Sequence, residues 1–64
     1  MTTFKEIIDC ADGGPTPPAH MNPAKTAYVG VYTMESGKVV ASIGEFFGAA
    51  LAREKFDKID LPVE

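Results

Sequence analysis

The stretch TAYVGVYTMESGKVVAS, residues 26–42, contains two runs of β-branched and aromatic residues separated by a glycine turn. Such residues favour strands, and Gly37 supplies the positive φ that a short hairpin loop requires. We therefore predict a β-hairpin over residues 26–41. Alternation divides its first strand into two largely apolar faces, one of Ala27, Val29, Val31 and Thr33 and the other of Tyr28, Gly30, Tyr32 and Met34. A two-stranded ribbon with two apolar faces needs cover on both sides.

The residues before the hairpin predict a first helix over residues 2–12, TTFKEIIDCAD. Thr3 and Glu6 have the spacing of a capping box at its start. An apolar stripe follows at helical spacing, formed by Phe4, Ile7, Ile8 and Ala11.

The residues after the hairpin predict a second helix over residues 42–60, followed by a tail over residues 61–64. Ser42 and Glu45 have the spacing of a second capping box, and Glu54 and Lys58 form a favourable i,i+4 pair. Its wide apolar stripe consists of Ile43, Phe46, Phe47, Ala50 and Leu51.

These elements predict a single α+β domain over residues 1–64 with the order α-β-β-α. A chain of 64 residues buries only about 60% of the surface that its unfolded form exposes. The single cysteine, Cys10, leaves no internal disulfide to stabilise the fold. We therefore expect the domain to be completed by dimerisation, as a homodimer.

The long segment GGPTPPAHMNPAK, residues 13–25, joins the first helix to the hairpin in this prediction. Structureless connections of this length are uncommon and are usually functional or disordered. Three interpretations remain open: a stiff spacer, a loop that binds a partner protein, and a polyproline ligand of the SH3 type. The candidate partner-binding residues are Pro15, Thr16, Pro17, Pro18, His20 and Met21.

A row of small residues, Gly44, Gly48 and Ala52, recurs every four positions in the predicted second helix. Such spacing permits close packing, either against a second copy of the helix or beneath Tyr28 or Tyr32 of the hairpin. Both alternatives predict that Gly48 is buried. The candidate self-association residues are Gly44, Phe47, Gly48, Leu51, Tyr28 and Tyr32.

The residues that could support catalysis or bind a metal are few. Cys10 lies near the predicted C-terminus of the first helix, where the helix dipole disfavours a thiolate, and His20 lies alone in the loop. We therefore expect no catalytic site, no cofactor and no metal. The net charge of −3 argues against nucleic acid as a partner, and no apolar run is long enough to span a membrane. The expected location is the cytoplasm.

Residues 31–52, VYTMESGKVVASIGEFFGAALA, resemble the hairpin-then-helix pattern of roadblock-type domains and of HicB-type antitoxins. The later strands of the roadblock domain and the proline-containing motif of the HicB-type proteins are missing, so no family is assigned. We expect a small non-enzymatic protein that binds another protein, as an inhibitor, a regulator or an accessory subunit. The alternatives are an antitoxin-like regulator associated with nucleic acid and a small subunit of an enzyme complex.

Overall fold

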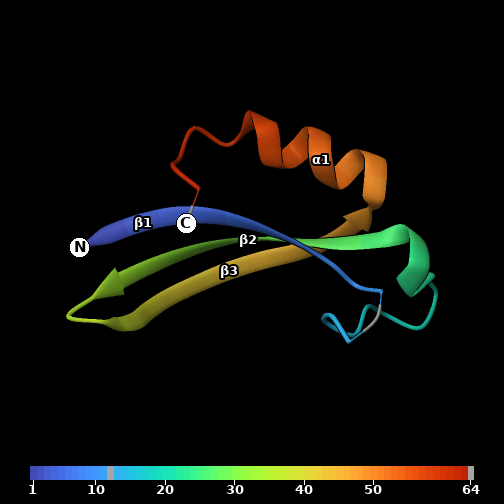
Figure 1. Ribbon diagram of the computed structural model, residues 1–64, viewed down its shortest axis with the longest axis horizontal. Coiled ribbons are helices and arrows are strands. Elements are labelled where there is room, and N and C mark those ends of the chain that lie inside the picture. Colours follow the sequence, from blue (N-terminus) through green and yellow to red (C-terminus); the bar gives the residue numbers. More distant parts are fainter. Residues whose placement is uncertain (12, 64) are drawn as a thin grey trace.

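Three antiparallel strands form one sheet in the order β1-β2-β3, and a single helix crosses one face of it (Figure 1). The computed structural model describes residues 1–11 and 13–63. The elements are β1 (Thr2–Asp9), the 3₁₀ turn η1 (Pro23–Lys25), β2 (Thr26–Glu35), β3 (Lys38–Gly48) and α1 (Ala49–Lys58). The α+β class is confirmed, but the predicted order α-β-β-α is wrong, because the order is β-β-β-α.

The predicted N-terminal helix is replaced by strand β1, which pairs with β2 along its whole length, from Thr2 opposite Met34 to Asp9 opposite Ala27. Four of the eight residues of β1 are threonine or isoleucine, which lose side-chain freedom in a helix and pack well in a sheet. β2 is the central strand, paired with β1 along one edge and with β3 along the other. Asp12, the last residue of the predicted helix, lies outside the described residues.

The predicted second helix is too long, because residues 42–48 continue strand β3 and the helix covers only Ala49–Lys58. Thr26–Thr33 pair with Ala41–Gly48, so long-range pairing outweighs the local helical pattern. Ser42 lies within the strand, and the helix begins after Gly48, which provides no side-chain cap. The expected Glu54–Lys58 ion pair is confirmed at 3.2 Å. Glu64, at the end of the predicted tail, lies outside the described residues.

A two-residue turn joins β2 to β3. Ser36 and Gly37 both have positive φ, 54° and 78°, the combination of a type I′ hairpin turn. The positive φ expected for Gly37 is thus confirmed. The register shifts by one residue between Thr33 and Met34, which marks a β-bulge in the distal part of the hairpin.

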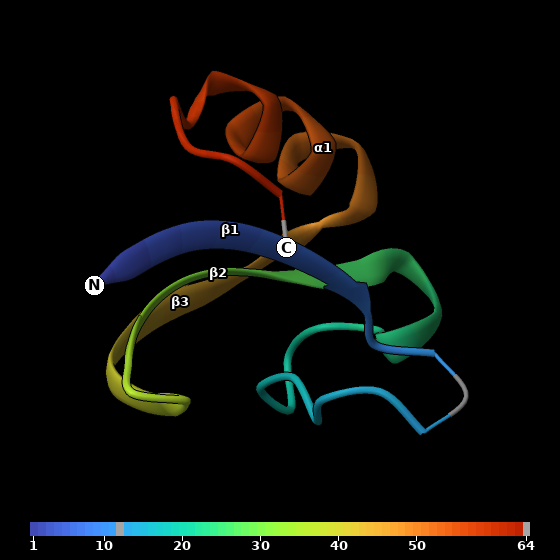
Figure 2. The ribbon, with the colours of Figure 1, turned by 60° about the vertical axis from the view of Figure 1, so that its left-hand side comes forward.

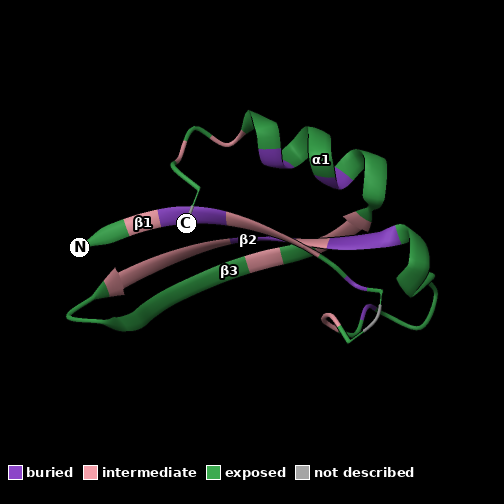
Figure 3. Cartoon of the chain, in the orientation of Figure 1, coloured by how far each residue is buried: buried purple, intermediate pink, exposed green. Residues whose placement is uncertain are grey.

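The core lies between the sheet and the helix. It consists of Ala27, Val29, Ala52 and Phe56, with Ile7, Phe47 and Ile59 packed around it. Ala52 and Phe56 are one helical turn apart and form the buried stripe of α1. Figure 3 shows that burial is concentrated under the helix, while most of β3 is exposed.

Lys5 joins β1 to the helix from inside the structure. Its side chain is buried, its Nζ donates a hydrogen bond of 2.7 Å to the carbonyl oxygen of Phe56, and Nζ lies 4.2 Å from the centre of the Phe56 ring. Its backbone N–H donates to the carbonyl of Pro62, and a bridge to Val63 lays the C-terminal tail along the outer edge of β1. One residue therefore fixes the helix end and the tail to the same strand.

The segment between β1 and β2 lies on the opposite side of the sheet from the helix (Figure 2). Pro17 in this segment is buried. At the two ends of the segment, the N–H of Cys10 donates a hydrogen bond to the carbonyl of Thr26. Asn22 accepts from the N–H of Ala24 through its side chain and from the Thr26 hydroxyl through its carbonyl. Residues 13–25 therefore form a loop that hydrogen bonds and the buried Pro17 hold against the rest of the fold, although most of these residues are exposed.

Candidate binding face

The sheet face away from the helix, called here the helix-free face, carries most of the aromatic side chains. Strand pairing sets Phe4 opposite Tyr32, Ile8 opposite Tyr28, and Tyr28 opposite Phe46, and paired residues project to the same face. The Phe4 and Tyr32 rings stack at a centroid distance of 5.5 Å, and the Tyr28 and Phe46 rings meet edge to face at 5.0 Å. These contacts give the face two pairs of packed aromatic rings.

Two paired glycines, Gly30 and Gly44, lie beneath the tyrosine rings. A Cβ at residue 44 would overlap the Tyr28 ring, and a Cβ at residue 30 would come within 3.0 Å of both tyrosines. The tyrosines therefore lie across the strands over positions where no side chain stands. Packing of a tyrosine over a glycine was one of the two alternatives for the row of small residues, but it occurs in a strand and involves Gly44. Gly48 is exposed, so the prediction that it is buried is wrong.

Substitution Gly44→Val is expected to lower the free energy of unfolding by about 1 to 3 kcal/mol, because the new side chain displaces Tyr28. In a Tyr28→Ala background the same substitution should cost much less, since the overlapping ring is gone. Urea unfolding of the four proteins of this double-mutant cycle measures the coupling. Equal costs in the two backgrounds would contradict this packing.

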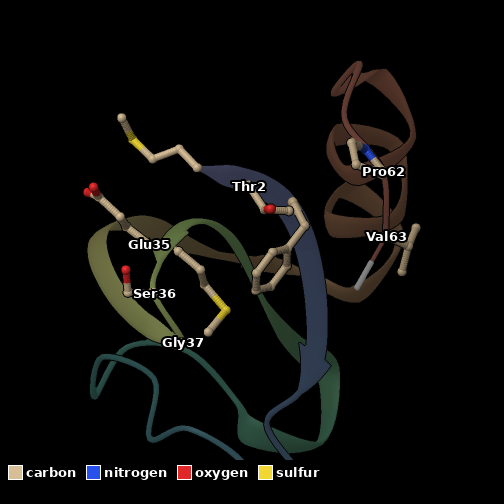
Figure 4. Close-up of a pocket in the computed structure, with 9 residues that line it drawn as sticks. Thr2, Glu35, Ser36, Gly37, Pro62 and Val63 are labelled. Carbon is tan, nitrogen blue, oxygen red and sulfur yellow. The ribbon is translucent and has the colours of Figure 1, made fainter.

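Two adjoining hollows open where the helix-free face meets the start of β1 and the hairpin tip. The smaller, about 290 Å³, is lined by Phe4, Glu6, Tyr32, Met34 and Val39. The larger, about 510 Å³, is shown in Figure 4 and is lined by Met1, Thr2, Phe4, Met34, Glu35, Ser36, Gly37, Pro62 and Val63. Phe4 and Met34 line both hollows, so the two form one continuous surface, called here the Phe4–Met34 groove.

The charged side chains along the Phe4–Met34 groove are carboxylates. Glu6 lines the smaller hollow and Glu35 the larger, and neither hollow has a lysine or arginine among its described lining residues. The groove therefore combines polarizable apolar side chains with carboxylates and suits a ligand that is both apolar and basic.

Some of the candidate loop residues are buried or half-buried, and others are exposed. Pro17 is buried, and Pro15 and Met21 are half-buried. Thr16, Pro18 and His20 are exposed, and the N–H of Met21 donates to the carbonyl of Pro18 to close a tight turn around them. Of the candidate residues, Pro18 and His20 lie in this turn and Thr16 lies just before it.

The candidate self-association residues do not form one surface. Phe47 packs toward the core, Gly48 is an exposed helix cap, and Leu51 is 46% exposed on the helix. Gly44, Tyr28 and Tyr32 belong to the helix-free face. The predicted row of small residues on a helix does not exist, because Gly44 and Gly48 lie in β3.

Sequence reasoning missed Phe4, Glu6, Met34 and Val39 as lining residues. In the predicted helix Phe4 belonged to the apolar stripe and Glu6 to the capping box, whereas alternation in β1 places them on the same face. Had residues 2–9 been interpreted as a strand, their period of two would have grouped Phe4 and Glu6 with Ile8.

Neither residue singled out for its potential chemistry lines the Phe4–Met34 groove. Cys10 is buried at the end of β1, and His20 is exposed in the loop. Within residues 1–11 and 13–63 there is no group of three or more histidine, cysteine or carboxylate side chains placed to hold a metal ion. None of the helices in the described part of the chain has the length and apolar character needed to cross a membrane.

No family model, no curated protein and no solved structure matches this chain.

Proposed function

We propose that this is a small non-enzymatic protein that binds a segment of another protein in the Phe4–Met34 groove, as an inhibitor, a regulator or an accessory subunit. The observation that carries the proposal is a groove lined by Phe4, Tyr32 and Met34 on a sheet face that the helix leaves uncovered. Aromatic and methionine side chains are the residues most enriched where proteins bind each other.

The shape of the molecule extends this surface. The hairpin tip curves toward the same side of the sheet on which the loop lies (Figure 2). A bound segment that follows the sheet face would run from the groove toward the turn that contains Pro18 and His20. We therefore retain the exposed loop residues as a second, more distant contact with the partner.

The partner's chemistry follows from the groove. An extended segment with a large apolar side chain would fill the space between Phe4 and Met34, and an adjacent lysine or arginine would lie close to Glu6 or Glu35. Salt should weaken such a complex only partly, because burial of apolar area supplies most of its free energy.

Selection from a random peptide library tests this proposal, with the folded protein as bait. We expect enriched peptides that combine an aromatic or aliphatic residue with a basic one. Met34→Lys should lose these peptides, because it places a like charge in the groove. Leu51→Lys, at an exposed helix position, should keep them. Failure to enrich any peptide, or retention of binding by Met34→Lys, would contradict the proposal.

The nucleic-acid alternative is favoured by one feature, the row of aromatic rings on an open sheet face, because such rings stack on the bases of single strands. The acidic groove and the net charge of −3 oppose it, since phosphate binding needs lysine and arginine. We expect no change in the fluorescence anisotropy of a labelled oligothymidine at low salt. Salt-sensitive binding that is lost in Tyr32→Ala would support the alternative.

A further inference from the structure

The two edges of the sheet differ in how they are closed. The outer edge of β1 is covered in part by the tail, through the bond from Lys5 N–H to the Pro62 carbonyl and the bridge to Val63. β3 forms the other edge, and no segment among residues 1–11 and 13–63 pairs with its outer side. Such an edge presents a row of backbone donors and acceptors to any strand that approaches.

The composition of β3 leaves this edge open to pairing. The strand is eleven residues long, from Lys38 to Gly48, and contains no proline and only two charged residues. Its exposed aliphatic residues are Val39, Val40 and Ile43, which are 55%, 54% and 73% exposed. Natural edge strands are usually protected because they are short, charged, interrupted by proline or twisted by a bulge. Of these features β3 has only the bulge near its start.

The chain also exposes more surface than a folded monomer of its mass. The accessible area is 4419 Å², whereas a typical monomer of 6.8 kDa exposes about 3,950 Å². The radius of gyration is 12.2 Å, against about 10.7 Å for a compact domain of 64 residues. Most residues of β3 are exposed, and the helix does not cover the distal hairpin (Figure 3).

An apolar hollow lies next to the open edge on the helix side of the sheet. Its volume is about 270 Å³, and Val31, Ile43, Phe47 and Ile59 are among its lining residues. Glu45 and Lys55 line the same hollow, so it holds one charge of each sign. A two-fold related copy would bring the opposite charges of two such hollows near each other, and its Ile43 would help to cover the exposed apolar residues.

We propose that β3 pairs antiparallel with β3 of a second copy, which joins two sheets into one of six strands. A strand that pairs with itself about a two-fold axis forms an isologous interface that closes at two chains. Like charges directly opposite destabilise a pair of strands, which disfavours a register centred on Glu45 and favours one centred on Ile43 or Gly44. Of the residues that line the Phe4–Met34 groove only Val39 belongs to β3, so this interface does not depend on the proposed function.

Sedimentation equilibrium of the full chain at micromolar concentrations tests this interface. We expect the mass of two chains. Ile43→Lys should halve the mass while circular dichroism retains the signature of the folded sheet, because the exposed residue 43 tolerates a lysine in the monomer. Leu51→Lys is the matched control and should remain a dimer, since the helix is not the interface.

A second measurement covers the case in which Ile43→Lys fails to fold. Hydrogen exchange of the β3 amides in the unmodified protein should slow as the protein concentration rises. A sedimentation mass equal to that of one chain, with a melting temperature that does not depend on protein concentration, would overturn the proposal. A dimer that persists in folded Ile43→Lys, or that dissociates only in Leu51→Lys, would also overturn it.

Discussion

Phe56→Ala is expected to leave the chain unfolded, or close to it, at room temperature. Phe56 is the largest side chain of the helix core and is 8% exposed, and it packs with Val29 and Ala27 of the central strand. Removal of a buried phenylalanine side chain costs about 3 to 5 kcal/mol. A domain of this length has a total stability of about 3 to 10 kcal/mol, so one substitution removes much of it.

The measurement is thermal unfolding followed by circular dichroism. Leu51→Ala is the matched control, because Leu51 belongs to the same helix but is 46% exposed, and its loss should be far smaller. Equal melting temperatures for Phe56→Ala and the unmodified protein would show that the helix does not stabilise the sheet.

Lys5→Glu is expected to destabilise the fold by about 3 kcal/mol or more, because it buries a negative charge among partners that favour a positive one. Nζ of Lys5 meets the Phe56 carbonyl near the C-terminus of α1 and the face of the Phe56 ring. Both the helix C-terminus and the ring face attract cations and repel anions.

Lys5→Met separates charge from packing in this prediction. Methionine retains an apolar stem of similar length and loses the hydrogen bond from Nζ to the Phe56 carbonyl, which also accepts from the N–H of Ile59 and so keeps a partner. We expect Lys5→Met to be clearly more stable than Lys5→Glu in urea unfolding. If the two variants were equally stable, the charge of Lys5 would have no role at the helix end.

The hairpin turn and the strand character of residues 26–35 were accessible from sequence because they depend on local chemistry, with a glycine at the turn and β-branched residues beside it. The strand conformation of residues 2–9 could not be predicted from local chemistry in the same way. Phe4, Ile7 and Ile8 fit a helical stripe, and only the pairing of β1 with β2 decides the competition. The two apolar faces of the strand that became β2 were interpreted as surfaces that need cover. The third strand, which pairs with the free edge of β2, was not predicted.

The residues of the helix-free face could be predicted only in part, because some of them reach it only through pairing between strands. Tyr28 and Tyr32 were predicted as self-association residues of the hairpin, whereas Phe4 and Glu6 reach the helix-free face only if β1 is a strand. Gly44 is an example. The sequence indicated that the small residues allow close packing, but the Tyr28 ring lies over Gly44 only because the strands pair. Burial of Pro17 likewise depends on how the loop folds back.

The most direct test of the claim that the helix-free face binds a partner is a titration of the protein with a library-selected peptide, followed by amide and methyl correlation spectra. We predict shifts of the Met34 methyl group and of the amides of Phe4, Glu6 and Tyr32, with the exposed helix residues Arg53 and Asp57 unchanged. Shifts concentrated on the helix, with Met34 and Phe4 unmoved, would contradict the account.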